Sequence, residues 1–139
     1  MADDFRTGQY LQGGDPEELE VFRRYLKRAV PDRNLVPLDS SHPIFHSYYD
    51  VDSLKMDPPY NRWCLNGLCS NNPFPGGVPV LVPQFWGLSD EHGRLQVIAN
   101  YNNDIGDFWK YLDQGEKPLG DSSRAVRMTI NYIVYAMSH

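Results

Sequence analysis

The stretch "QFWGLSDEHGRLQVIAN" (residues 84–100) decides the fold, because it predicts a β-hairpin. Two apolar runs flank the turn "DEHG" at residues 90–93, where Gly93 can supply the positive φ that such a turn needs. In the second run Val97 and Ala99 alternate with Ile98, so both faces of this strand are largely apolar. Helical patterns precede and follow the hairpin, which indicates an α/β layered domain.

The first helical pattern is "GGDPEELEVFRRYLKRAV" (residues 13–30). Asp15 can cap this helix, and Glu18 follows it at the spacing of a capping box. Pro31 ends the helix, because proline cannot continue the hydrogen-bond ladder. One apolar face recurs at helical spacing and consists of Leu19, Phe22, Leu26 and Ala29.

The second helical pattern is "GDSSRAVRMTINYIVYAMSH" (residues 120–139), for which Asp121 or Ser122 can act as the cap. Its apolar residues cover a wide arc, so we expect a largely buried helix. The arc consists of Val126, Ile130, Ile133, Val134 and Met137, and the first four are predicted to lie in the core.

The remaining segments are short or irregular. "LVPL" (residues 35–38) predicts a short strand, and His42 is expected to be extended because Pro43 follows it. Residues 52–83 form a long irregular excursion, which is uncommon inside a compact domain and is often functional. These patterns supply about three strands, too few to cover a helix that is apolar on most sides, so we expect a sheet that lacks its first strands.

Composition excludes several classes of protein. The 139-residue chain suits a single domain spanning residues 1–139, and its net charge of −5 disfavours nucleic-acid binding. The sequence has no apolar run long enough for a membrane span, and "MADDFRTGQY" is not a signal peptide. Cys64 and Cys69 have neither zinc-ribbon nor thioredoxin spacing, which leaves buried thiols, a disulfide or a metal site open.

Three stretches together resemble a known family. They are "ADDF" (residues 2–5), "VPDRNLVPLDSSHPIFHSYYDVD" (residues 30–52), and "GRLQVIANYNNDIGDFW" (residues 93–109) followed by "INYIVYAMSH". The chain is similar to a bacterial family of unknown function that is placed among the class I glutamine-amidotransferase-like folds. Family members carry "DDF", "FPDR", "HPIFH", "GRL", "NDxGD" and "YxxTH" motifs in this order. Ser138 stands where the family usually has threonine, so a hydroxyl is kept.

The resemblance implies a flavodoxin-like or glutamine-amidotransferase-like three-layer sandwich, of which this chain is the C-terminal portion. Full-length relatives are often exported, so the absence of a signal peptide leaves the localisation open. No activity is established for the family, and fold alone does not supply one. Neither Cys64 nor Cys69 lies on a strand-to-helix elbow, and no G-x-C-x-G or G-x-S-x-G motif occurs, which argues against amidotransferase or serine-hydrolase chemistry.

Polar residues gather where strands are expected to end. By the resemblance, Asp3 and Asp4 lie at the end of one strand, and the loop "YNNDIGDFW" (residues 101–109) follows another. Ligands in open α/β sheets sit at the carboxyl ends of strands. We therefore expect a ligand rim there, with His42 and the terminal His139 as further candidates. The predicted rim consists of Asp4, His46, Asp50, Asn103, Asp104 and Asp107.

The same loop also has a purely structural interpretation. Asn and Asp side chains favour turns, Gly106 can adopt positive φ, and Asp107 can cap a short helix "FWKYL" whose Trp109 packs on the core. Both interpretations account for the residues present.

Two functions remain open at this level. The first is a non-catalytic domain that binds a small-molecule or protein ligand, with residues 52–86 as its contact surface. The second is a metal-dependent or acid–base, hydrolase-like enzyme that uses Asp4, His46, Asp104 and Asp107. The sequence carries no cofactor motif and we expect no cofactor. An exposed edge of an incomplete sheet is expected to allow self-association.

Overall fold

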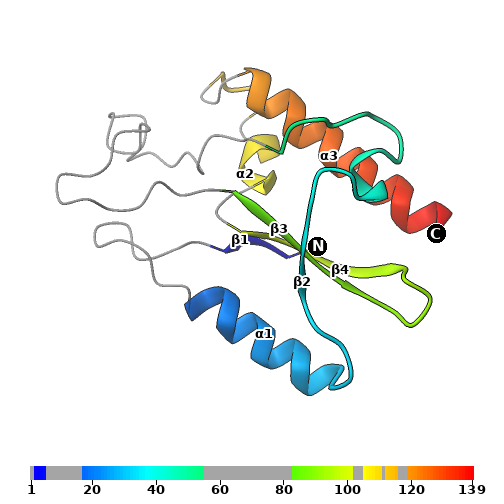
Figure 1. Cartoon of the computed structure of the whole chain (residues 1–139). Helices are drawn as coiled ribbons and strands as arrows, with labels where there is room; N and C mark the ends of the chain where they lie inside the picture. Colours follow the sequence, from blue (N-terminus) through cyan, green and yellow to red (C-terminus); the bar gives the residue numbers. More distant parts are fainter. Residues whose placement is uncertain (1, 6–16, 55–82, 102–104, 111, 116–118) are drawn as a thin grey trace.

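The chain folds into a mixed four-stranded sheet with helices on both faces (Figure 1). The strand order is β1-β4-β3-β2. The computed structural model describes residues 2–5, 17–54, 83–101, 105–110, 112–115 and 119–139. The predicted α/β class is therefore confirmed.

The hairpin at residues 84–100 is the centre of this sheet. Strands β3 (Gln84–Ser89) and β4 (Leu95–Tyr101) pair antiparallel, as the sequence predicts. Gly93 has φ 80° and its N–H donates to the Asp90 carbonyl oxygen at 3.1 Å, which closes the turn. The alternation of β4 also holds, because Val97 and Ala99 pack on one face and Ile98 packs on the other.

The two outer strands extend the hairpin on either side. The predicted short strand is β2 (Val36–Leu38), which pairs antiparallel with β3. Strand β1 (Ala2–Phe5) pairs parallel with β4, with Ala2 opposite Ala99 and Phe5 opposite Tyr101. The sheet therefore combines parallel and antiparallel pairs.

Helix α1 (Glu17–Ala29) covers one face of the sheet. Leu19 is buried against Leu88 and Ala99, and the half-buried Phe22 and Leu26 pack on the same cluster. The predicted face is thus correct up to its last member. Ala29 is exposed, and Val30 after the helix packs on the cluster in its place.

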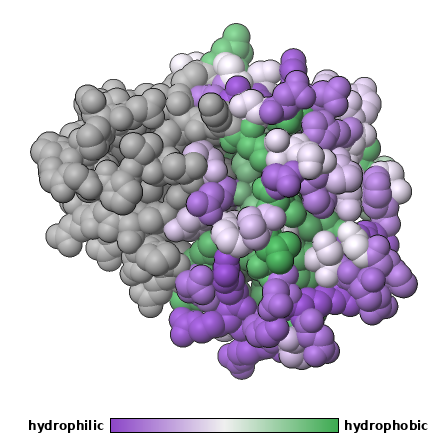
Figure 2. Space-filling view, viewed as in Figure 1, coloured by the Kyte–Doolittle hydropathy of each residue, from purple (hydrophilic) through white to green (hydrophobic). Residues whose placement is uncertain are grey.

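Helices α2 (Ile105–Lys110) and α3 (Leu119–Ser138) cover the opposite face. The 3₁₀ helix η1 (Pro43–Phe45) joins this layer, and His42 precedes it in the extended conformation expected before a proline. Phe45, Ile105 and Phe108 are completely buried there. Figure 2 shows hydrophobic residues in the band between the two helical layers and hydrophilic residues over the part of the surface where α1 lies.

The prediction for the buried face of α3 is wrong. Ile133 and Met137 are 55% and 82% exposed, and Val126, Ile130 and Val134 are only partly buried. Asp121 and Ser122 are not caps before the helix but lie within its first turn. The buried residues of α3 are Asp121, Ser122, Ala125, Met128, Asn131, Tyr132 and Tyr135.

The turn interpretation of residues 105–109 is also partly wrong. Helix α2 begins at Ile105, so Gly106 and Asp107 lie within it rather than before it, and Gly106 is not among the positive-φ glycines of the described residues. Phe108 is fully buried, whereas Trp109 is 37% exposed and does not anchor the core. The helix starts three residues earlier than the predicted segment "FWKYL", and its buried side is formed by Ile105 and Phe108, which are three residues apart.

Some predictions fall outside the described residues. These are the caps Asp15 and Glu18, whose side chains are not described, Cys64 and Cys69, and most of the excursion at residues 52–83. Among the helices that the structure describes, none is long and apolar enough to cross a membrane.

Candidate ligand-binding pocket

A buried asparagine holds the loop at residues 45–49, which leads into one wall of the candidate pocket. Asn131 of α3 is completely buried, and its Oδ1 accepts from the backbone N–H groups of Tyr48 (3.0 Å) and Tyr49 (2.8 Å). Its Nδ2 donates to the carbonyl oxygens of Phe45 (2.7 Å) and Tyr49 (2.8 Å). One side chain thus uses both its donor and its acceptor atoms to fix the backbone of residues 45–49.

A histidine in this loop contacts Ser40 before the loop and Asp50 after it. His46 Nε2 lies 2.7 Å from the carbonyl oxygen of Ser40, and Nδ1 lies 3.1 Å from Asp50 Oδ1. The hydrogen bond to the Ser40 carbonyl, followed by the one to the Asp50 carboxylate, raises the pKa of His46 above its ordinary value. Both contacts suit the imidazolium form, in which each ring nitrogen donates a proton.

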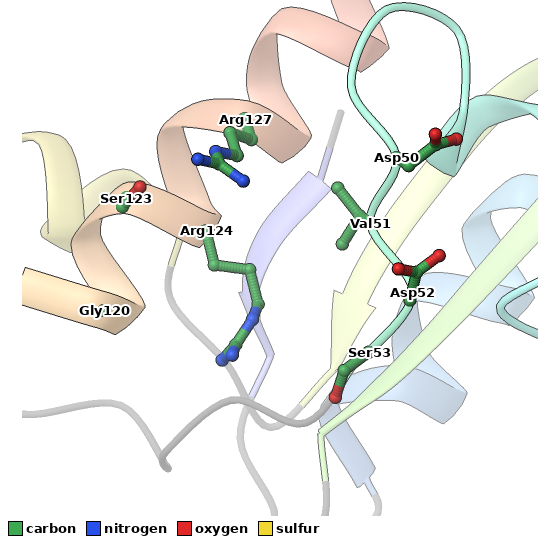
Figure 3. Close-up of a pocket in the computed structure, with 8 residues that line it drawn as sticks. All are labelled: Asp50, Val51, Asp52, Ser53, Gly120, Ser123, Arg124 and Arg127. Carbon is green, nitrogen blue, oxygen red and sulfur yellow. The ribbon is translucent and has the colours of Figure 1, made fainter.

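The residues after this loop form one side of an open pocket of about 310 Å³ (Figure 3). Residues 50–53 line this side, and the first half of α3 lines the other. The volume lies near the lower limit for small-molecule sites. The α3 side contributes Gly120, Ser123, Arg124 and Arg127, and the loop side contributes Asp50, Val51, Asp52 and Ser53.

The charges on the two sides have opposite signs, and several already have partners. Arg124 Nη1 lies 3.1 Å from Asp121 Oδ1 within α3, and Asp50 pairs with His46. The Arg127 guanidinium lies 5.5 Å from the centre of the Tyr49 ring. Within the part of the chain that the structure describes, Arg127 and Asp52 have no ion-pair partner at salt-bridge distance. The Asp52 carboxylate adds to the raised pKa of His46 without an ion-pair contact. Arg127 and Asp52 are therefore the two pocket charges with which a ligand can pair directly.

The structure describes the side chains of only part of the predicted rim. His46 and Asp50 contact each other, and Asp50 lines the pocket. Asp4 lies in β1 and Asp107 in α2, but their side chains are not described, and Asn103 and Asp104 lie outside the described residues. The parallel pairing of β1 with β4 brings the carboxyl ends of these two strands to one edge of the sheet, as the rim hypothesis requires.

The other histidine candidates lie near the C-terminal end of α3. His139 stacks on Tyr135 with ring centres 4.3 Å apart, and the His42 ring lies 6.1 Å from the same tyrosine. Burial lowers the pKa of His42. The Nδ1 atom of His42 accepts from the Ile44 N–H at 3.2 Å, which gives this histidine a structural role as the cap of η1.

Sequence reasoning missed the arginine side of this pocket. Arg124 and Arg127 are three residues apart in a helix, a spacing that places both on one side of it. This spacing is the signal in the sequence from which the arginine side could have been predicted. Asp52 is the last residue of the family-like stretch at residues 30–52 and the first of the irregular excursion, and it was not predicted to belong to the site.

Metal ligation finds little support among the described residues, which contain no group of three or more His, Cys, Asp or Glu side chains placed to hold an ion. His46 illustrates the reason. Its Nε2 must donate to a carbonyl oxygen and its Nδ1 faces a carboxylate, so neither nitrogen offers a lone pair to a metal.

The fold and the pocket together define a class: an α/β domain with helices on both faces of a mixed sheet and an open polar pocket beside the last helix. The family comparison is more specific. The chain belongs to the family described as a domain of unknown function (DUF4159), whose model matches residues 1–137. This confirms the predicted membership of a family of unknown function. Searches of the curated proteins and of the solved structures found no significant match.

Proposed function

We propose that this chain is a non-catalytic binding domain that takes a small zwitterionic ligand in the pocket between α3 and residues 50–53. The observation that supports this is the pair of available charges on its two sides. Arg127 provides a planar cation for a carboxylate, and Asp52 provides an anion for an ammonium group. A volume of about 310 Å³ suits a molecule of amino-acid size.

The mixed charge decides against simpler ligands. A plain anion such as phosphate would be attracted by Arg127 and repelled by Asp52, and a metal cation would meet the reverse. The other charged groups of the pocket do not change this balance, because Asp50 is paired with His46 and Arg124 with Asp121. A ligand that carries both signs satisfies both walls.

A matched set of three probes tests the proposal. We expect alanine to raise the melting temperature of the protein at millimolar concentration, because it carries both charges. N-acetylalanine lacks the ammonium group and alanine amide lacks the carboxylate, so each should shift the melting temperature less. The variants Arg127→Gln and Asp52→Asn should each weaken alanine binding at least about tenfold, which corresponds to the loss of one charge-assisted contact.

Arg24→Gln on α1 is the matched control, since it removes an exposed positive charge from the opposite face of the sheet. Its affinity for alanine should equal that of the wild type. Equal binding of all three probes, or an alanine affinity that neither pocket variant changes, would contradict a zwitterion site.

The competing proposal is a metal-dependent or acid–base enzyme with a rim of Asp4, His46, Asp104 and Asp107. The His46–Asp50 contact at 3.1 Å favours it, because a carboxylate beside an imidazole can support proton transfer. Thermal melts with and without a divalent metal distinguish the metal-dependent form of this enzyme from the binding domain. The metal-dependent enzyme requires a metal-dependent shift in melting temperature that Asp104→Asn removes, whereas the binding domain does not respond to metal.

For the architecture, we propose a flavodoxin-like or glutamine-amidotransferase-like domain, with residues 1–139 as the C-terminal portion of a single domain. The parallel pair β1 and β4, with helices on both faces, supports this proposal. β1 is an outer strand of the four described, so further parallel strands would add beside it and self-association could use the same edge. A crystal structure of a longer protein of this family would test the proposal directly.

A further inference from the structure

The ion pair of Asp50 depends on the proton that His46 carries. Asp50 Oδ1 lies 3.1 Å from His46 Nδ1, and no described residue forms a hydrogen bond or an ion pair with Asp50 Oδ2. The Asp50 side chain is 82% exposed and lines the pocket between α3 and residues 50–53. When His46 loses its proton, Asp50 therefore becomes a third pocket charge with which a ligand can pair.

Asp52 lies two residues further along the same wall. Both aspartates are exposed, whereas Val51 between them is buried. Such alternation is typical of an extended chain, in which residues two apart lie on one side at a spacing of about 6.5 Å. Figure 3 shows the two aspartate side chains on the same side of this segment. A ligand with two ammonium groups can therefore reach both carboxylates.

We propose that the pocket takes amino acids that carry a second ammonium group on the side chain, such as lysine, and that Asp50 determines this specificity. The inference rests on the proposed zwitterion site, in which Arg127 pairs with the ligand's carboxylate and Asp52 with its α-ammonium group. The side-chain ammonium group then pairs with Asp50. The two nitrogen atoms of an extended lysine are separated by nearly the spacing of the two aspartates.

His46 opposes the second ammonium group while it is protonated. The imidazolium neutralises Asp50 and repels another cation at the same carboxylate. The remaining close neighbour of the His46 ring is the carbonyl oxygen of Ser40, which carries no net charge. The other charged side chains that line the pocket are Asp52, Arg124, which pairs with Asp121, and Arg127, which lies beside Tyr49.

The charge of the pocket therefore changes with pH through His46. Carboxylates and guanidinium groups ordinarily keep their charge between pH 6 and 8, whereas a histidine changes its charge near that range. The Ser40 carbonyl and the Asp50 carboxylate raise the pKa of His46. As the pH rises through this raised pKa, Asp50 loses its partner, and the affinity for a second ammonium group should increase.

Calorimetry with lysine and norleucine tests the specificity, because norleucine has the same chain length without the second ammonium group. Once His46 is neutral, we expect lysine to bind at least about threefold more tightly, which is the scale of an exposed ion pair. At pH 6 the two affinities should be nearly equal. Asp50→Asn should remove the advantage of lysine. Glu20→Gln is the matched control, because it removes an exposed carboxylate on α1, and it should keep that advantage.

The titration of His46, followed by NMR in the wild-type protein, provides a second test that needs no variant. If the ligand's second ammonium group shares Asp50 with His46, bound lysine must lower the pKa of His46, because coupling between two binding events is reciprocal. Bound norleucine should lower it less. A histidine that only holds the loop in place would titrate alike in both complexes.

The results distinguish this inference from the zwitterion site on which it rests. Binding of alanine and norleucine without an advantage for lysine at any pH would overturn the specificity alone. An advantage that Asp50→Asn leaves unchanged, or a His46 titration that lysine and norleucine change equally, would also overturn it. Absence of binding by all three amino acids would overturn both proposals.

Discussion

Helices α1 and α3 lie on opposite faces of the same sheet, but the sequence predicts the buried face of only one of them, α1. In α1 the apolar residues occupy one side, and that side packs on the sheet as periodicity predicts. In α3 apolar residues occur on every side, so hydrophobicity does not choose a face. Individual contacts therefore determine which face of α3 is buried, and Asn131 is buried whereas Ile133 is exposed.

The buried face of α3 is selected by its polar groups. Asn131 makes four hydrogen bonds to the backbone of residues 45–49, and the Tyr132 hydroxyl donates to Asn100 Oδ1 at 3.1 Å. If the helix rotated to bury Ile133, these groups would lose partners inside the protein. An unpaired buried polar group costs about 1–3 kcal/mol, which exceeds the gain from covering a half-exposed isoleucine.

The largest effect is therefore expected at a polar residue. Asn131→Ala should reduce the free energy of unfolding by about 3–4 kcal/mol, because the backbone groups of the 45–49 loop lose their partner in or near the core. Urea denaturation measures this change. A loss below about 1 kcal/mol would show that water replaces the side chain and that the asparagine does not choose the face of α3.

A second comparison, within α3 itself, concerns a buried and an exposed apolar residue. Met128→Ala should cost about 2–3 kcal/mol, because Met128 is completely buried between α3 and the sheet. Ile133→Ala should cost less than about 1 kcal/mol, because more than half of that side chain is exposed. Equal losses of stability would mean that Ile133 is covered in the folded protein.

The same contrast explains how much of the molecule the sequence could predict. The hairpin, the short strand at residues 36–38 and the three helical segments are local patterns, and all are present. The family resemblance and the general rule for strand ends predict only that the first strand and β4 end at one edge of the sheet, and their direct parallel pairing was not predicted. No local pattern encodes that pairing, because the two strands are far apart in the sequence.

The pocket was predictable only in part, for a physical reason. Asp50 and His46 were predicted as rim residues because carboxylates and imidazoles commonly bind ligands or transfer protons, and these two side chains contact each other. The position of Asp50 across the pocket from the arginines depends on how the loop before it runs along α3, and Asn131 fixes the backbone of residues 45–49. A mid-helix asparagine does not announce such a role in the sequence, so Arg124, Arg127 and Asp52 were not identified.

A smaller effect is expected on the other face of the sheet. Leu19→Ala should cost about 2 kcal/mol, because Leu19 is the only buried side chain among the described residues of α1, and its neighbours Phe22 and Leu26 are partly exposed. Chemical denaturation of Leu19→Ala and Met128→Ala under the same conditions compares the two losses of stability. A larger loss at Leu19 than at Met128 would reverse our ranking of the two helical layers.

The smallest effect concerns the pH dependence of the loop that Asn131 holds. The carbonyl oxygen of Ser40 and the carboxylate of Asp50 raise the pKa of His46 above its ordinary value of 6.5. Folding therefore favours the imidazolium form. This stabilisation is fully present below pH 6.5, and it is lost as the pH rises through the raised pKa of the folded state.

We expect His46→Gln to remove this dependence, so that its melting temperature falls less than that of the wild type when the pH rises from 6 to 8. His42 serves as the internal contrast, because burial lowers its pKa and its contribution is lost in the opposite direction, as the pH falls below 6.5. His42→Gln should therefore leave the alkaline slope unchanged. If wild type and His46→Gln show the same slope between pH 6 and 8, the contacts to Ser40 and Asp50 do not hold the proton, and the loop depends on Asn131 alone.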